Sequence, residues 1–205
     1  MTRTVGIWMS MMCIGIVCAT AATAASAAPP PTLHLVKDPG NRFTITVPAD
    51  WNVQTSSGGR TPAVSAISPP ASGQLSDSVD VIAQDLPIAL SPQGCAGEVA
   101  QIMRFTIHEW TTLQEGPATL AGLPAYSRSY TWRTRTGQDR RSVQTCVTMG
   151  RRAFVIVGTT ANTQSDIQEH LARLEQIMAT FQPNAKNLPD TQGPGTLQPQ
   201  EGGSK

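Results

Sequence analysis

The chain has 205 residues, with 15 Lys and Arg against 14 Asp and Glu, and only 14% of its residues are charged. A chain of this length accommodates one domain with short extensions, and a body of about 150 residues can bury a self-sufficient core. The near-neutral balance lacks the basic excess that is typical of nucleic-acid binding, so a nucleic-acid partner is not expected.

Residues 1–28 have the pattern of a secretory signal peptide. Arg3 supplies a positive start, an apolar run covers 5–17, and Ala, Thr and Ser residues follow, with cleavage expected near Ala24, Ala27 or Ala28. The apolar run is shorter than the roughly 20 residues of a membrane span. The mature chain is therefore expected to be periplasmic or secreted, and not transmembrane after cleavage. A retained signal anchor is the alternative.

The cysteines divide between the signal peptide and the mature chain. Cys18 ends the apolar run, but Val17 precedes it where lipidation requires a small residue, so ordinary cleavage is favoured over a lipid anchor. Cleavage removes Cys13 and Cys18 and leaves Cys95 and Cys146, which predict one disulfide in an oxidising compartment. The long loop between them would give about 4 kcal/mol of stabilisation. Two free buried thiols are the alternative.

Between residues 32 and 86 the sequence predicts strands separated by loops. The strand at 43–47 alternates apolar residues with threonine. Trp51 follows this strand and is expected to close the edge of the core. Three other segments are bounded by turn signals: 32–38, as a short strand or extended arm, 63–68 and 78–86.

A helix and then a four-strand meander are expected next. Apolar residues recur at helical spacing over 92–110, Ser91 is a suitable N-cap, and Pro92 suits the first helical position. The meander strands are 111–120, 125–135, 142–149 and 153–157.

The last hairpin of the meander organises the predicted sheet. In its first strand Val143 and Val147 fall on one face and Cys146 on the other, whereas residues 153–157 are apolar at every position. An uninterrupted apolar strand is typical of a sheet covered on both faces. The prediction is an α+β fold in which helices flank both faces of an antiparallel sheet, with 153–157 at its centre.

The chain is expected to close with a second helix and a tail. An apolar stripe runs from Ile167 to Phe181, Ser165 and Gln168 match a capping box, and Pro183 ends the helix. Residues 184–205 are rich in Gly, Pro and Gln without an apolar period, which is typical of disorder. The folded domain is therefore expected at 33–183.

Four segments resemble the PsbP-like superfamily, which includes photosystem II PsbP, exported bacterial proteins of the DcrB type and a Ran-binding nuclear-import factor. They are Phe43-Thr-Ile-Thr-Val-Pro-Ala-Asp-Trp51, Val79-Asp-Val-Ile-Ala-Gln-Asp-Leu-Pro87, Gly122-Leu-Pro-Ala-Tyr126 and Ala179-Thr-Phe181. The resemblance covers about 33–183. It implies an antiparallel sheet sandwiched by helices and a binding or assembly role without catalysis, and it transfers no catalytic residue. The family pattern does not require the pair Cys95 and Cys146.

No local motif supports catalysis, a cofactor or a metal. His34, His108 and His170 lack ligands at metal-binding spacing, and no Gly-x-Ser-x-Gly elbow, Walker loop or dinucleotide fingerprint occurs. Asp77, Asp80 and Asp85 lie near one strand. Asp80 has opposite parity to the other two, so they are expected to be separate, solvated positions.

Basic residues are distributed unevenly along the sequence and gather in the meander. Six arginines of the meander form a possible partner surface: Arg133, Arg135, Arg140, Arg141, Arg151 and Arg152. They surround two successive turns, which lie at opposite ends of a meander, so two clusters are expected. An acidic partner or anionic headgroups would suit them, and ordinary solubilising charge is the alternative. The loops at 55–62 and 69–77 are further candidate contact regions.

Three functions remain open from the sequence. The first is an exported, non-enzymatic binding or assembly protein of the bacterial cell envelope, with an unknown protein or small-molecule partner and no cofactor. The second is an envelope hydrolase or other enzyme with a site assembled from scattered polar residues. The third is a secreted factor acting on a host or competitor. The absence of a local nucleophile-and-base signature favours the first.

Overall fold

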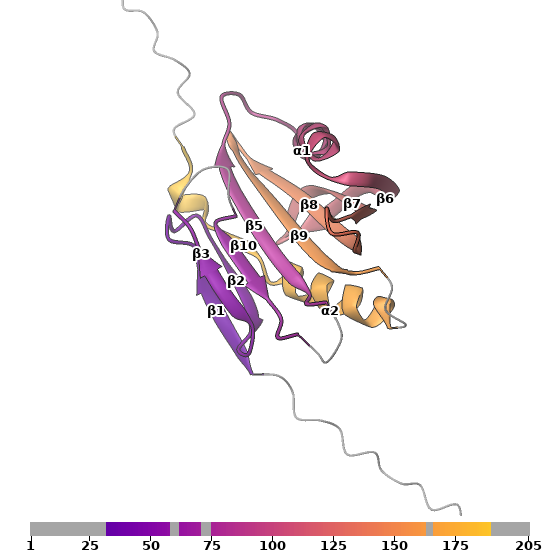
Figure 1. Cartoon of the computed structure of the whole chain (residues 1–205). Coiled ribbons are helices and arrows are strands. Elements are labelled where there is room, and N and C mark those ends of the chain that lie inside the picture. The colour runs from indigo at the N-terminus through magenta and orange to yellow at the C-terminus, as the bar shows by residue number, and fades with distance from the viewer. Residues whose placement is uncertain (1–31, 58–61, 71–74, 163–165, 190–205) are drawn as a thin grey trace, which may run out of the picture. The chain divides into compact units, whose positions relative to one another are not determined.

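The computed structural model describes residues 32–57, 62–70, 75–162 and 166–189. The predicted signal peptide, Ser165 and residues 190–205 of the predicted tail lie outside these ranges. The described chain forms two antiparallel sheets and two α-helices (Figure 1). The α+β class and the antiparallel sheet are therefore confirmed.

The smaller sheet has three strands, and the sequence did not predict that they form a separate sheet. It contains β1 (Leu33–Lys37), β2 (Phe43–Pro48) and β10 (Gln182–Pro183), in the order β1-β2-β10. β10 is only two residues long and follows the last helix, so no alternation in the sequence could reveal it. It brings the end of the domain back beside its first strands.

The larger sheet has seven strands. They are β3 (Asn52–Thr55), β4 (Val64–Ile67), β5 (Ser78–Asp85), β6 (His108–Leu120), β7 (Leu123–Arg133), β8 (Asp139–Met149) and β9 (Arg152–Ala161). Their order is β3-β4-β5-β9-β8-β7-β6, which confirms the meander and places β9 at the centre. β3 was not predicted because its mostly exposed residues show no apolar pattern.

The β8–β9 hairpin forms as expected. Gly150 turns the chain with a φ of 60°, and Met149 pairs with Arg152. Alternate residues of the hairpin enter two different clusters. Phe154 and Ile156 belong to the main core, whereas Ala153, Val155 and Cys146 form a second cluster with the first helix.

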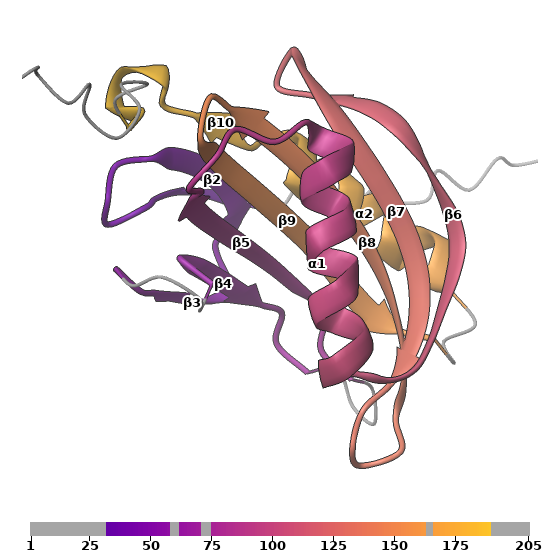
Figure 2. The same ribbon diagram turned by 90° about the horizontal axis from the view of Figure 1, so that it is seen from above.

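The first helix is shorter than predicted. α1 (Pro92–Thr106) starts at Ser91, whose Oγ accepts from the Gly94 amide at 3.0 Å. It ends at Thr106 instead of Trp110, because Ile107 is extended and the chain continues directly into β6. Trp110 packs edge-on against Tyr130 at 5.5 Å between ring centroids. Figure 2 shows α1 running across the near side of β8 and β9.

The second helix closes the main core. α2 (Ile167–Ala179) buries Leu171, Leu174, Ile177 and Met178, and it begins at Asp166 without a side-chain cap. It packs closely on β9, since a Cβ at Gly158 would lie 3.1 Å from the Leu174 Cβ.

Three phenylalanines meet where α2, β2 and β9 come together. Phe154 lies 6.1 Å from Phe43 and 5.2 Å from Phe181, measured between ring centroids. All three rings are fully buried. Trp51 is buried in the same core, as predicted.

The ordered chain continues past Pro183, where the sequence predicted the tail to begin. A 3₁₀ helix, η1 (Ala185–Asn187), follows β10. The Asn187 side chain donates to the Gly40 carbonyl at 2.8 Å, which ties this segment to the β1–β2 turn.

Candidate functional site

A polar groove of about 440 Å³ lies between α2 and the outer strands β6, β7 and β8. It forms because α2 packs mainly against β9, β5 and β2 and leaves the strands beyond β9 open. We call it the α2 groove. It is lined by Gln114, Glu115, Gly116, Pro117, Ser127, Arg128, Ser129, Arg141 and Val143 from the strands and by Gln168, Leu171, Ala172 and Glu175 from the helix.

Arg141 is the basic side chain of the α2 groove on β8. Its position opposite Thr131 of β7 and Thr160 of β9 is fixed by the strand register. The Nε of Arg141 is buried and has no hydrogen-bond partner among the described residues. Five other arginines of the described chain form ion pairs with carboxylates: Arg42, Arg128, Arg133, Arg152 and Arg173. Arg141 thus has unused donor capacity inside a groove.

The rest of the α2 groove offers neutral polar groups and two acids, of which Glu115 is ion-paired with Arg128. Ser127 and Ser129 supply hydroxyls, Gln168 supplies an amide, and Glu175 is an exposed carboxylate on α2. A guanidinium can bind a carboxylate or phosphate through two parallel hydrogen bonds. The groove is therefore suited to hold a polar ligand by an anionic group.

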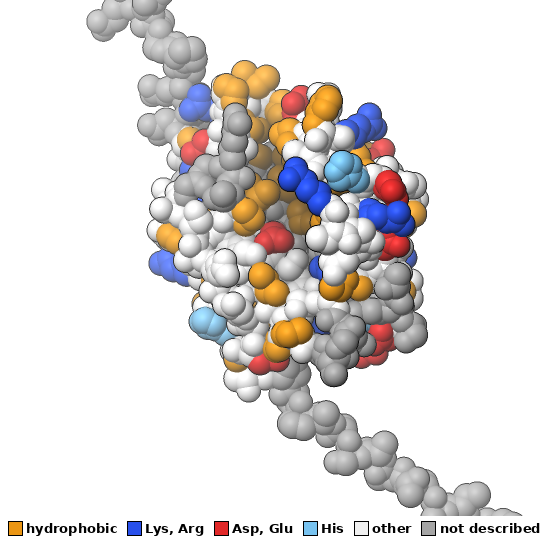
Figure 3. All heavy atoms as spheres, in the orientation of Figure 1, with side chains coloured by type: hydrophobic (Ala, Val, Ile, Leu, Met, Phe, Trp, Pro, Cys, Tyr) orange, Lys and Arg blue, Asp and Glu red, His pale blue; other side chains and the backbone are white. Residues whose placement is uncertain are grey.

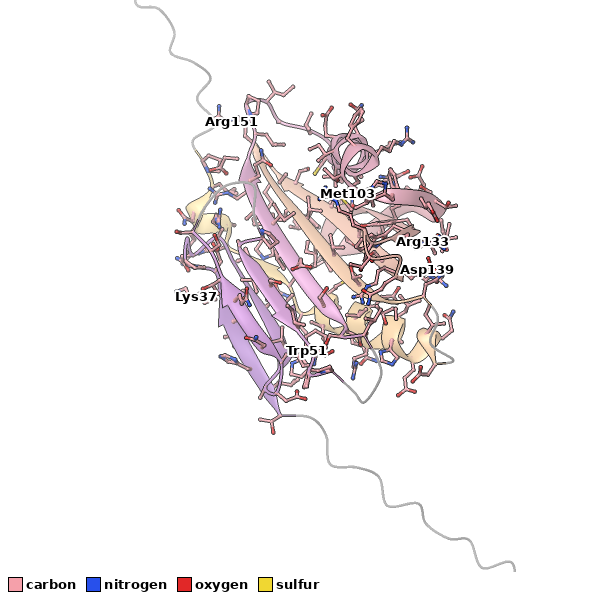
Figure 4. The ribbon with its side chains drawn as sticks, viewed as in Figure 1. Lys37, Trp51, Met103, Arg133, Asp139 and Arg151 are labelled. Atoms are coloured by element: carbon pink, nitrogen blue, oxygen red, sulfur yellow. The ribbon has the colours of Figure 1, made fainter. Side chains whose placement is uncertain are left out.

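The other predicted surface arginines are divided between the two ends of β8. Arg133 pairs with Asp139 at 2.8 Å, and Figure 4 shows these two side chains together and Arg151 at the opposite end of the sheet. Arg135 is exposed in the β7–β8 turn, and Arg140 donates to the Ser76 carbonyl at 2.9 Å. Arg152 is only 6% exposed and pairs with Asp85.

Asp77 is the centre of an ion-pair cluster, so the expectation that it would be solvated is wrong. Its side chain is 1% exposed and accepts from His170 Nδ1 at 2.7 Å and from Arg173. Burial alone would raise the pKa of Asp77, but hydrogen bonds from Thr160, Arg173 and His170 outweigh it and hold the pKa below its usual value. Arg173 also lies 5.8 Å from the centre of the Trp51 ring.

A hydroxyl near this cluster raises the question of a hydrolytic triad. Ser68, Asp77 and His170 line a common pocket of about 240 Å³. However, His170 Nδ1 faces Asp77 and its Nε2 lies 3.3 Å from Asp166, so both ring nitrogens face carboxylates. The Ser68 Oγ accepts from the Asp77 amide at 2.9 Å. The geometry is that of an ion-pair network, because no ring nitrogen is directed at the serine.

Sequence reasoning missed this cluster because its members are far apart. Asp77 precedes β5, whereas His170 and Arg173 lie on α2, 93 and 96 positions later. His34 and His108 are exposed and distant from it in sequence. No spacing rule connects an aspartate in a loop to two residues of a later helix, so only the tertiary fold could reveal the cluster.

The two mature cysteines come together beneath α1. Cys95 of α1 and Cys146 of β8 are buried and unbonded, with a near contact at 3.7 Å. Their mutual hydrogen bond raises the pKa of the Cys146 thiol and lowers that of Cys95.

The described ranges contain no group of three or more His, Cys, Asp or Glu side chains that could hold a metal ion. None of their helices is both long and apolar enough to cross a membrane.

Solved structures share this architecture at low sequence identity. Cyanobacterial PsbP (CyanoP) from Synechocystis matches with a TM-score of 0.56 at 12% identity, over 80% of this chain and 99% of that chain. LpqN of Mycobacterium tuberculosis, described as involved in cell envelope biogenesis, matches at 0.50 and 16% identity, over 73% and 89%. The Ran-binding protein Mog1p of Saccharomyces cerevisiae matches at 0.50 and 14% identity, over 75% and 96%.

The fold is therefore PsbP-like. The family model named DcrB matches residues 43–180, and the chain belongs to the DcrB family. No curated protein matches the sequence. At these identities the structural neighbours show the fold alone, because one fold can carry many unrelated functions.

Proposed function

We propose that this chain is an exported, non-enzymatic binding or assembly protein of the bacterial cell envelope, which holds a partner or small ligand in the α2 groove. The observation that carries the proposal is Arg141, a guanidinium without an ion pair among the described residues in a polar groove of about 440 Å³. The signal-peptide pattern of residues 1–28 supports export. Membership of the DcrB family and the likeness to LpqN, a protein involved in cell envelope biogenesis, support the envelope.

Of the six arginines of the predicted partner surface, Arg141 is the one that we assign to the binding site. Arg133 and Arg152 already pair with carboxylates, whereas Arg141 faces the groove. The group it would bind is an anion with two acceptor oxygens, a carboxylate or a phosphate. Hydroxyls of Ser127 and Ser129 and the amide of Gln168 would bind other polar parts of the same ligand.

Replacing Arg141 with glutamine is expected to weaken retention of the bound species by about tenfold or more, since a charge-assisted hydrogen bond contributes about 1.5–3 kcal/mol. The measurement is affinity capture from envelope extract at moderate salt, followed by titration of whatever is retained. Arg135→Gln is the matched control, because it removes the same charge from an exposed turn. Equal retention by both variants would contradict the assignment of the α2 groove.

A hydrolase is the alternative function that the sequence left open, and its candidate residues line one pocket. The pocket of Ser68, Asp77 and His170 holds a hydroxyl, a carboxylate and an imidazole close together. A screen of ester and amide substrates separates the two functions, because turnover that is lost on Ser68→Ala would establish catalysis. A binding protein should show no turnover that depends on Ser68.

We also propose that Cys95 and Cys146 form a disulfide in the exported protein. They lie on α1 and β8 with a near contact at 3.7 Å, so a modest shift would bring the sulfurs to about 2.0 Å. Intact mass and thiol labelling under denaturing conditions should show no free thiol before reduction and two after it. Removal of the bond by Cys→Ser substitution at both positions should cost about 4 kcal/mol. Labelling of both cysteines without reductant would contradict the pairing.

We also infer from β9 that helices cover both faces of the seven-stranded sheet. Phe154 and Ile156 pack with α2, whereas Ala153 and Val155 pack with α1, which supports a helix on each face of the seven-stranded sheet. The domain is proposed to extend from 33 to at least 183, preceded by the signal peptide at 1–28 and followed by the tail at 184–205, of which η1 is ordered.

A further inference from the structure

Asp80 of β5 differs from the other acidic residues that are at least partly buried in the described chain. Asp38 pairs with Arg42, Asp77 with His170 and Arg173, and Asp139 with Arg133. Asp80 is half-buried and has no basic partner among the described residues. Its carboxylate accepts only from hydroxyls, Ser65 at 2.6 Å and Ser78 at 3.5 Å.

The surroundings of Asp80 form an open strip on the side of the sheet that carries α1. α1 packs mainly against β6, β7 and β8, and Ile82 and Val157 are partly buried against the cluster that it forms with the sheet. Asp80 pairs in register with Ser65 of β4 and Val157 of β9, and Ile67 and Ile82 lie on the same face. These neighbours are all partly exposed. Figure 3 shows several hydrophobic side chains exposed on this side of the molecule. We call Ser65, Ile67, Asp80, Ile82 and Val157 the Asp80 strip.

An unpaired carboxylate among apolar side chains is costly for the folded state. Burial raises the pKa of Asp80, and the hydrogen bonds from Ser65 and Ser78 only partly oppose this effect. The charged form of Asp80 is therefore less favourable in the folded chain than in the unfolded chain. Proteins retain such unfavourable groups chiefly where function uses them.

We propose that the Asp80 strip docks a segment of a protein partner that presents a lysine or arginine flanked by apolar side chains. Charge complementarity identifies the occupant, because a cation would supply the ion pair that Asp80 lacks. Ile67, Ile82 and Val157 would cover the apolar flanks and exclude water from the pair. The strip is separate from the α2 groove, so this inference does not depend on the proposed function of Arg141.

The substitution Asp80→Asn makes the proposal testable without loss of the fold. Asparagine keeps the shape and removes the charge, so the variant should melt at a higher temperature than wild type at pH 7. A raised folded-state pKa means that Asp80 destabilises the fold once pH rises above the unfolded value of about 3.9, so the difference should vanish below about pH 4. A variant that melts lower than wild type at pH 7 would mean that the chain itself supplies a cation, and would overturn the proposal.

Binding is tested with a display library of random linear peptides selected on the wild-type protein, on Asp80→Asn and on Glu98→Gln. Glu98 is an exposed acid of α1, so its variant is the charge-matched control. Wild type and Glu98→Gln should enrich peptides with a basic residue between apolar ones, and Asp80→Asn should bind them at least tenfold more weakly. Arg141→Gln should bind them unchanged, which separates this test from that of the α2 groove. Selection of the same peptides by Asp80→Asn, or no enrichment of basic residues, would overturn the proposal. Self-association that Asp80→Asn abolishes would instead identify a second copy as the occupant.

Discussion

Replacing Phe154 with alanine is expected to lower the free energy of unfolding by about 3–5 kcal/mol. The ring is fully buried at the centre of the sheet, between Phe43 and Phe181. Its removal leaves a cavity. The cavity cannot collapse easily, because β9 is held by strands on both sides and α2 already packs closely on Gly158. Chemical denaturation with two probes, one of them near-UV absorption of the aromatic core, measures the loss.

Phe105→Ala is the control for this prediction. Phe105 is the same residue type but lies on the outer surface of α1 and is 91% exposed. Its replacement should change stability by no more than about 0.5 kcal/mol. Similar losses for both variants would mean that β9 is not the centre of the core.

Asp77→Asn should lower the free energy of unfolding by about 2–3 kcal/mol at pH 7, because it removes the counter-ion of Arg173 and one of the two carboxylates that face His170. The pKa of Asp77 is lowered in the folded state, so its contribution is fully present above the unfolded pKa of about 3.9. It is lost as pH falls through the folded value. The gap between wild type and variant should therefore close below about pH 4, as measured by denaturation at a series of pH values.

Asp50→Asn gives the matched comparison for Asp77. Asp50 lines the same pocket and carries the same charge, but it is exposed and has no ion pair among the described residues. The expected change in stability is close to zero at every pH. If Asp77→Asn were also neutral at pH 7, the cluster would not hold α2 against the β5 loop.

Local patterns predicted most of the fold. Alternation separated Val143 and Val147 from Cys146, and the unbroken apolar run from Ala153 placed β9 at the centre of the sheet. Ser91 and Pro92 fixed the start of α1. Each of these signals is carried by neighbouring residues, so no knowledge of the tertiary structure was needed.

The errors arose where the chain changes conformation without a local signal. Trp110 fits the apolar spacing of α1, yet Ile107 is extended and Glu109 has a φ of 51°, so Trp110 belongs to β6. β3 and β10 are too short or too exposed to show a pattern. Propensity and periodicity are weak guides at such boundaries, where tertiary packing decides.

The candidate site was predicted less completely than the fold. Arg141 was among the six arginines of the predicted surface, but nothing in the sequence distinguished it from Arg152, which is buried against Asp85. The opposite wall of the α2 groove, with Gln168 and Glu175, depends on where α2 lies over the sheet. The sequence predicted a solvated Asp80. Only the fold shows that it is half-buried and that no basic side chain among the described residues pairs with it.

The most direct test of the central claim is site-specific photo-crosslinking in intact cells. A photoreactive amino acid replaces Ala172, an exposed residue of α2 in the α2 groove, and a second copy of the experiment places it at Phe105 on α1. A binding protein that uses the groove should give a defined crosslinked species from position 172, absent from position 105 and strongly reduced when Arg141→Gln is added. Crosslinks that ignore Arg141, or no crosslinks together with turnover that depends on Ser68, would contradict it.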